Sequence, residues 1–75
     1  MKYSKTTCSL FILFELLEKH TINTDWVCYV LDISKLNLYR YVRDIKNFFV
    51  EFNRYEYSIL YFRSKNCYCL VVDDS

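Results

Sequence analysis

Apolar residues recur at every third or fourth position over most of the chain before residue 53. This is the spacing of one face of a helix. It predicts three helices, at about residues 7–19, 24–31 and 35–52. Each begins beside side chains that can accept a hydrogen bond from an early N–H group, namely Thr6 or Thr7, Asn23 or Thr24, and Ser34.

The first predicted helix is apolar on more than one face. The stripe expected to face the core is Leu10, Phe11, Phe14 and Leu17, and Leu13 widens it. Ile12 and Leu16 add apolar character elsewhere, which is typical of a helix that is central or that contacts a second subunit. The acidic residues Glu15 and Glu18 are expected to face solvent.

The second and third predicted helices are joined by a tight turn at residues 32–34. Asp32 tolerates the left-handed backbone conformation that such a turn needs, and Ile33 is expected to enter the core. The core stripe of the second helix is predicted to be Trp26, Val27, Val30 and Leu31. That of the third is predicted to be Leu38, Tyr41, Val42, Ile45, Phe49 and Phe52.

A hairpin is expected after the helices. Residues 56–62 and 67–72 are rich in tyrosine, isoleucine, valine and phenylalanine, which favour strands. The polar residues 63–66 join them, and Asn66 can adopt the positive φ that a hairpin turn needs. Residues 73–75 are expected to be a frayed tail. The predicted fold class is therefore α+β, in one domain over residues 1–75.

A helix-turn-helix signature lies in residues 27–45. The matching positions are Val27-Cys28, Leu31-Asp32-Ile33-Ser34, Leu38 and Val42. They resemble bacterial winged-helix regulators of the DeoR-like and biotin-repressor-like type, in which a leucine, a small residue, a leucine, a turn and a valine-serine pair precede the recognition helix. The run Leu38-Tyr39-Arg40-Tyr41-Val42-Arg43-Asp44-Ile45 is similar to the end of that helix. Asp32 departs from the glycine that many such units place there.

The resemblance covers about residues 7–72 and implies a winged helix, with three helices and a C-terminal β-hairpin wing at about 56–72. Residues 20–23 would add a short strand to the wing, with Ile22 pointing inward. The implied function is sequence-specific binding of double-stranded DNA by a small bacterial or phage transcriptional regulator. Its recognition helix, at about residues 35–49, would lie in the major groove.

The third predicted helix carries most of the positive charge. The formal net charge of the chain is +1, whereas residues 34–54 hold five basic and two acidic side chains. The major groove of DNA admits one α-helix, whose early side chains reach base edges. We therefore expect DNA contacts from Ser34, Lys35, Leu36, Asn37, Tyr39, Arg40, Arg43 and Lys46.

Several of these side chains suit particular bases. Asn37 is suited to reading adenine, and Arg40 or Lys35 to reading guanine. Leu36 can contact the methyl group of thymine. The alternative is that these residues are only the solvated face of an amphipathic helix.

Other side chains suit the phosphate backbone. Arg43, Lys46 and the Ser34 hydroxyl can hold phosphates, which position a protein without reading sequence. At the hairpin turn, Arg63 and Lys65 can reach a neighbouring groove or the DNA backbone.

The composition favours a protein partner as well. The chain of 75 residues has no glycine or proline, and 20% of its residues are aromatic. A domain this small cannot bury so many rings, and surplus apolar surface usually marks an interface. The simplest partner is a second copy, so we expect a homodimer.

No signal peptide or membrane-spanning segment is recognisable, so we expect a cytoplasmic protein without membrane contact. There the cysteines would stay reduced. The four cysteines and His20 invite a zinc site, but Cys67-x-Cys69 lacks the usual spacing and the other candidates fall in predicted helices. We therefore expect no metal and no cofactor. A single histidine without a glycine loop or paired carboxylates gives no basis for an enzyme or a small-molecule substrate.

Two alternatives to duplex binding stay open. A winged helix can be a protein–protein interaction module, which the low net charge and the aromatic excess fit. Aromatic residues of the hairpin could stack on single-stranded bases, although no dense basic groove accompanies them. The alternative of a protein–protein interaction module is favoured if Asp44 and Glu51 neutralise the basic face of the third helix.

Overall fold

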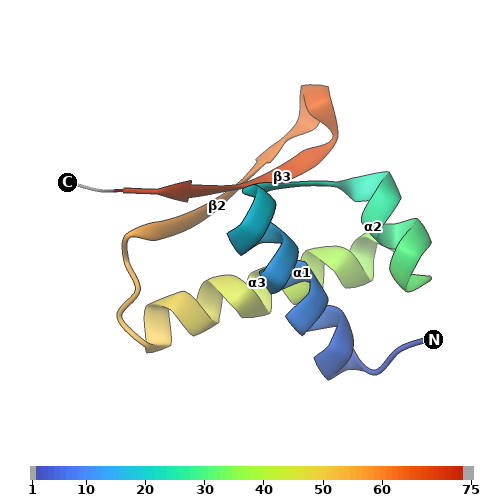
Figure 1. Cartoon of the computed structure of the whole chain (residues 1–75), viewed down its shortest axis with the longest axis horizontal. Coiled ribbons are helices and arrows are strands. Elements are labelled where there is room, and N and C mark those ends of the chain that lie inside the picture. Colours follow the sequence, from blue (N-terminus) through green and yellow to red (C-terminus); the bar gives the residue numbers. More distant parts are fainter. Residues whose placement is uncertain (1, 74–75) are drawn as a thin grey trace.

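The computed structural model describes residues 2–73. Within them the chain forms three helices and a three-stranded antiparallel sheet, so the α+β class is confirmed (Figure 1). The helices are α1 (Lys5–Lys19), α2 (Thr24–Leu31) and α3 (Lys35–Glu51). The strands are β1 (Thr21–Asn23), β2 (Tyr57–Phe62) and β3 (Cys67–Val72), and the short 3-10 helix η1 (Arg63–Lys65) joins the last two.

The sheet has the order β1-β3-β2, which places the last strand in the middle. Ile22 of β1 lies opposite Tyr68, and Ile59 of β2 lies opposite Leu70. All four side chains are buried, and the helices lie on one side of the sheet (Figure 1). The short strand with an inward Ile22 is therefore present.

The hairpin differs from the prediction by one residue, since β2 begins at Tyr57 rather than at Glu56. The N–H of Asp73 donates to the carbonyl oxygen of Glu56 at 2.8 Å, so the first residue of the expected tail is held beside the hairpin. The rest of that tail, residues 74–75, lies outside the described residues.

One apolar cluster joins all three helices to the sheet. Burial of this cluster removes apolar surface from water, which is the main force that holds such a domain together. Its members are Cys8, Ile12, Leu16, Ile22, Val27, Leu31, Ile33, Leu38, Tyr41, Val42, Ile45, Phe49, Ile59, Tyr68 and Leu70.

The face of α1 that enters the core is not the predicted one. The buried stripe is Cys8, Ile12 and Leu16, each with no exposed surface. Leu10, Phe14 and Leu17 instead expose 60%, 59% and 45% of their surface, whereas Phe11 and Leu13 of the predicted stripe pack against the core. Both stripes have helical spacing, so periodicity identified the helix but not its inner face.

Glu15 is also placed against expectation. It is buried rather than solvent-facing, and Lys19 Nζ lies 3.0 Å from its Oε1 atom. A buried carboxylate needs such a partner. The N-cap of α1 is Ser4, whose hydroxyl accepts a hydrogen bond from the Thr7 N–H at 3.1 Å. Neither Thr6 nor Thr7 is the cap, and the helix begins at Lys5, two residues before the predicted start.

The caps of α2 and α3 agree with the sequence. Asn23 Oδ1 accepts a hydrogen bond from the Trp26 N–H at 2.9 Å, and Ser34 Oγ accepts one from the Asn37 N–H at 3.1 Å. Each bond satisfies an N–H group that has no partner inside its own helix. The start of α3 is thereby fixed at Lys35.

Two aromatic residues predicted to be in the core are largely outside it. Phe52 exposes 60% of its surface because α3 ends at Glu51 and the chain turns away at Asn53, where φ is 58°. Trp26 exposes 43% and lies beside Phe11, with ring centroids 5.9 Å apart. Stripes at helical spacing therefore overstate burial where a helix ends or lies at the edge of the core.

Four residues adopt the left-handed backbone conformation within residues 2–73, in a chain that has no glycine. They are His20, Asp32, Asn53 and Asn66, with φ between 51° and 66°. Asp and Asn tolerate this conformation because their short polar side chains can form local hydrogen bonds. Asp32 and Asn66 were predicted to do so. Histidine has a larger side chain, and that of His20 forms no hydrogen bond within residues 2–73.

Replacing His20 with glycine should therefore stabilise the domain. A left-handed residue other than glycine costs about 1–2 kcal/mol, and the greater freedom of unfolded glycine offsets about 0.5–1 kcal/mol of the gain. The hydrogen bond that the Leu70 N–H donates to the carbonyl of residue 20, at 2.8 Å, would be kept. We expect the melting temperature, followed by circular dichroism, to rise by roughly 2–6 °C. Asn53→Gly is the matched control and should change the melting temperature less, because asparagine tolerates the left-handed conformation. Equal shifts in the two variants would contradict this explanation.

Candidate nucleic-acid interface

The start of α3 is held rigidly by the turn that precedes it. Asp32 has φ 55° and donates its N–H to the Cys28 carbonyl, which also accepts the Ile33 N–H at 3.1 Å. Ile33 is buried beneath the turn. The Ser34 oxygen accepts the N–H of Asn37, but its hydroxyl hydrogen can still be donated to another group.

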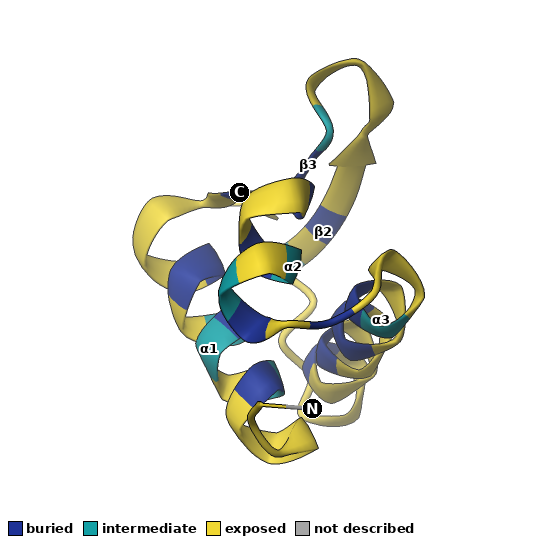
Figure 2. Ribbon diagram, turned by 90° about the vertical axis from the view of Figure 1, so that its right-hand side faces the viewer, coloured by how far each residue is buried: buried dark blue, intermediate teal, exposed yellow. Residues whose placement is uncertain are grey.

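Most of the predicted contact residues of α3 lie on one exposed surface. Leu38, Val42, Ile45 and Phe49 are buried on the inner side of the helix. Figure 2 shows α3 nearly end-on, with buried positions on one side and exposed positions on the other. We name the exposed side the outer face of α3; it consists of Leu36, Tyr39, Arg40, Arg43, Lys46 and Asn47.

Sequence reasoning missed Asn47. It is exposed and lies four residues after Arg43, so the two side chains are neighbours on the helix surface. The signal was this spacing, which continues the row of Leu36, Arg40 and Arg43 by one more turn. Asn37 is less available than predicted, because it is half-buried rather than exposed.

A polar chain of contacts links α3 to the hairpin through α2. Lys35 Nζ lies 3.6 Å from Asp25 Oδ1, and Asn66 Nδ2 donates to Asp25 Oδ2 at 2.8 Å. The Tyr61 hydroxyl donates to Asn66 Oδ1 at 3.1 Å. The Thr24 N–H also donates to the Asn66 carbonyl at 2.9 Å. The fold thus places the base of the hairpin turn beside the first turn of α3.

Acidic residues neutralise the outer face only in part. Arg43 Nη2 lies 3.9 Å from Asp44 Oδ1, and Lys35 Nζ lies 3.6 Å from Asp25 Oδ1. More than half of each of these four side chains is exposed. Exposed pairs of this kind contribute about 0–1 kcal/mol, so a phosphate can compete for either cation. Within residues 2–73, Arg40 and Lys46 form no ion pair. Glu51 pairs with none of these cations in the same part of the chain.

The two predicted residues of the hairpin turn are exposed. Arg63 and Lys65 belong to η1, and Asn66 closes that turn with φ 51°. Figures 1 and 2 show the turn projecting away from the helices. Lys65 is next to the Asn66 that contacts Asp25, whereas Arg43 and Lys46 lie two to three turns along α3. The structure therefore brings the turn close to Lys35 but not to the far half of the helix.

The half-buried Cys28 and the buried Tyr68, both near this interface, stay uncharged at neutral pH. Burial raises the pKa of the Cys28 thiol, and the nearby Asp25 carboxylate raises it further while Lys35 lowers it. Burial likewise raises the pKa of Tyr68, with the neighbouring Tyr61 and Tyr39 acting in the same direction. Neither group adds negative charge to the interface at neutral pH.

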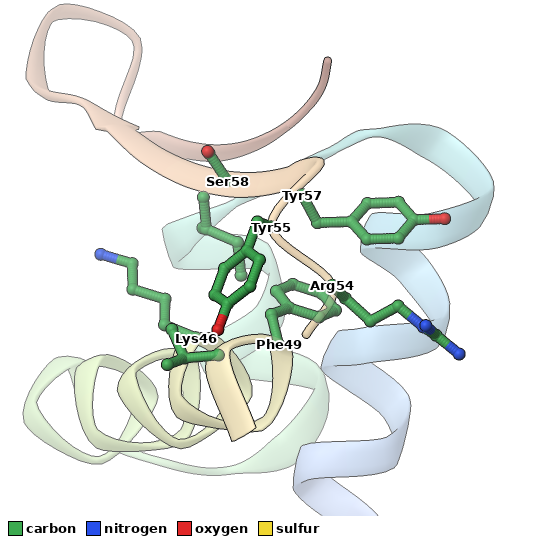
Figure 3. A pocket seen from close by; sticks show the side chains of 8 residues that line it. Lys46, Phe49, Arg54, Tyr55, Tyr57 and Ser58 are labelled. Carbon is green, nitrogen blue, oxygen red and sulfur yellow. The ribbon is translucent and has the colours of Figure 1, made fainter. Parts of the chain in front are cut away.

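An open pocket of about 280 Å³ lies between α3 and β2, beside Lys46. Its aromatic lining includes Phe49 and Tyr57, which are stacked with ring centroids 5.1 Å apart. Figure 3 shows the Lys46 amine and the Ser58 hydroxyl on the same side of the Tyr55 ring. Both groups are hydrogen-bond donors in the lining of this pocket.

The cysteines show no constellation for zinc. Cys67 Sγ and Cys69 Sγ are 3.9 Å apart, and Cys69 Sγ is 3.6 Å from the Thr21 hydroxyl. Across residues 2–73, no three histidine, cysteine, aspartate or glutamate side chains converge as metal ligands. All four cysteines are free thiols.

No helix within residues 2–73 combines the length and the apolarity that crossing a bilayer requires. Among protein-family models, curated proteins and solved structures, none matches this chain significantly.

Proposed function

We propose that this protein is a winged-helix domain that binds double-stranded DNA as a small cytoplasmic transcriptional regulator, with α3 in the major groove. The observation that carries the proposal is the outer face of α3. It presents Arg40, Arg43 and Lys46 on a helix whose opposite side is anchored in the core. A rigid helix with exposed cations can approach the anionic groove and keep its side chains in register with the bases.

The topology supports the same proposal. The order of elements, with a helix-turn-helix followed by a hairpin whose second strand pairs with β1, is the order expected for a winged helix. The Asp25–Asn66 contact places the hairpin beside the start of α3. A hairpin in that position can act as the wing, with Arg63 and Lys65 on the DNA backbone or in an adjacent groove.

The side chains of the outer face divide by chemistry. Arg40 can donate two hydrogen bonds to the O6 and N7 atoms of guanine, and Leu36 can pack against a thymine methyl group. Arg43 and Lys46 suit phosphates, and the Ser34 hydroxyl at the start of the helix can donate to another. Asn37, half-buried, has a smaller role in this arrangement than sequence alone indicated.

Fluorescence anisotropy with a labelled random-sequence duplex tests the proposal. If about four to six phosphates are contacted, the logarithm of the binding constant should fall with the logarithm of salt concentration with a slope of about −3.6 to −5.4. Selection of enriched duplexes would then give the preferred sequence. A folded protein that does not bind at low salt would contradict the proposal.

A protein–protein interaction module is the second candidate. The observation that favours it is the exposed apolar surface, which includes Phe14 at 59%, Phe52 at 60% and Tyr29 at 85% exposure. A module of this kind would show little affinity for duplexes and little dependence on salt. The same titration therefore separates the two candidates.

The Asp25 carboxylate should weaken DNA binding, because it holds Lys35 and adds negative charge beside the first turn of α3. Asp25→Asn removes that charge but keeps an oxygen that can accept the hydrogen bond from Asn66. We expect duplex affinity at low salt to rise by about fivefold, which corresponds to about 1 kcal/mol for an exposed charge. Glu56→Gln is the matched control, and a similar rise there would show a general charge effect.

A further inference from the structure

The outer side of α1 is apolar, although it points away from the core. Leu10, Phe14 and Leu17 share this side and expose 45–60% of their surface; we name them the outer stripe of α1. At 100° per residue they lie opposite the buried Cys8, Ile12 and Leu16. A helix that is apolar on two opposite sides belongs between two packed layers, and residues 2–73 supply only one of them.

A groove continues the outer stripe toward α3. It has a volume of about 290 Å³ and is lined by Ser9, Leu10, Leu13, Asp44, Ile45 and Phe48. Phe48 exposes 45% of its surface and lies against Phe52, with ring centroids 5.0 Å apart. The apolar surface therefore runs unbroken from α1 across to the end of α3.

We propose that this surface binds a second copy of the chain through an antiparallel crossing of the two α1 helices. The groove adjoins the first half of α1, whereas the protruding Phe14 and Leu17 lie in its second half. A two-fold axis across α1 sets the second half of each helix against the first half of the other. Phe14 of each copy then enters the groove of its partner, so the surface complements itself as a two-fold interface requires.

The exposed apolar area supplies more than half of what each partner of a stable dimer buries. A fully buried aromatic side chain covers roughly 150–250 Å², so the exposed parts of Leu10, Phe14, Leu17, Phe48 and Phe52 amount to on the order of 500 Å². A stable interface of standard size buries about 800 Å² on each partner, including a polar rim. Monomeric proteins rarely expose a contiguous apolar surface larger than a few hundred Å².

The crossing also fits two-site binding to DNA, a step that rests on the proposed function. The groove meets α3 at Asp44, Ile45 and Phe48, none of which belongs to its outer face, so a partner seated there leaves the outer face of α3 open. Packed helices are about 8–10 Å apart, and the row α3, α1, partner α1, partner α3 has three such spacings. The two copies of α3 would be separated by up to about 30 Å, near the spacing of about 34 Å between successive major grooves on one side of DNA.

The outer surface of the sheet is a less suitable place for the second copy. Leu60, Phe62 and Val71 are 41–48% exposed there, across the sheet from the helices. On α1, by contrast, the exposed Phe14 is accompanied by the groove, so this surface supplies both a protrusion and a hollow.

Sedimentation equilibrium of the whole chain, without DNA, tests the dimer over about 1–100 μM. The apparent mass of the wild-type protein should be twice the 9.2 kDa of one chain. Phe14→Glu should raise the dissociation constant at least about 30-fold, since a buried aromatic at the centre of an interface is commonly a hot spot. Phe62→Glu makes the same change on the other apolar surface and should leave the dimer intact. Circular dichroism checks that each variant is folded.

Three results would overturn the proposal: a monomeric wild-type protein, a dimer that persists in Phe14→Glu, or a dimer lost only in Phe62→Glu. A monomer would assign the surface to a different protein. The mass is measured without DNA, so failure to bind duplexes leaves this result unaffected. Conversely, folded Phe14→Glu monomers should still bind a single half-site weakly if only the dimer interface has been removed.

Discussion

Replacing Arg40 with glutamate is expected to lower affinity for duplex DNA by about 100-fold or more. Arg40 is exposed on the outer face of α3 and forms no ion pair within residues 2–73. Loss of a paired contact to guanine costs about 1–3 kcal/mol, and a carboxylate facing the groove adds repulsion. Anisotropy titrations at fixed low salt measure the change.

Arg54→Glu is the matched control for this experiment. It changes the net charge by the same amount, but Arg54 follows the end of α3 and lies off its outer face. Figure 3 shows its guanidinium directed away from Lys46. The Arg54 variant should therefore lose only a few-fold in affinity through long-range electrostatics. Equal losses would show binding through overall charge, and no loss for Arg40→Glu would remove α3 from the interface.

The second large effect is expected in stability, from Leu38→Ala. Leu38 has no exposed surface and lies where α3 meets the core. Truncating a fully buried leucine removes buried apolar surface and leaves a cavity, at a cost of about 2–5 kcal/mol. The whole stability of a chain this long is on the order of 4–11 kcal/mol. Chemical denaturation should show a much lower midpoint or a largely unfolded protein.

Leu36→Ala makes the same change two residues earlier on the same helix. Leu36 exposes 57% of its surface, and substitutions at such positions usually change stability by less than about 0.5 kcal/mol. The Leu36 variant should remain stable and lose only its contact with DNA. Similar destabilisation by both changes would mean that the packing of α3 differs from that described.

The sequence was most informative where one residue has one local role. Asn23 and Ser34 accept hydrogen bonds at the starts of α2 and α3, and each is followed directly by its helix. Asp32 and Asn66 are short polar residues between regular elements, where a left-handed conformation was needed. Such positions depend on neighbours close in the chain, so pattern and propensity are enough to predict them.

Burial could not be predicted where two patterns compete. Both sides of α1 are apolar, and only the positions of α3 and the sheet decide that Ile12 faces inward and Phe14 outward. A carboxylate is expected at the surface, but Glu15 is buried because Lys19, one turn later, supplies a nearby cation. Phe52 has helical spacing, yet the helix has already ended there. These outcomes depend on tertiary packing rather than on local pattern.

The candidate interface was predictable as far as it lies along α3. Spacing along α3 is enough to place Arg40 and Arg43 together on an exposed surface. The contact of Asp25 with both Lys35 and Asn66 joins residues that are 10 and 41 positions apart in the chain. No periodic signal connects them, because their approach depends on how α2 packs against α3 and the hairpin.

The position of β3 has a consequence for how the chain acquires its structure. β3 is the last strand along the chain and the middle strand of the sheet, so β1 and β2 each have it as their neighbour. During synthesis the three helices and β1 leave the ribosome before any strand can pair. Ile22 can pair with Tyr68 only after β3 has been synthesised. Pairing between residues so far apart in the sequence slows folding. We expect the helices to associate first, with their apolar surface transiently open, and the sheet to form in a single late step.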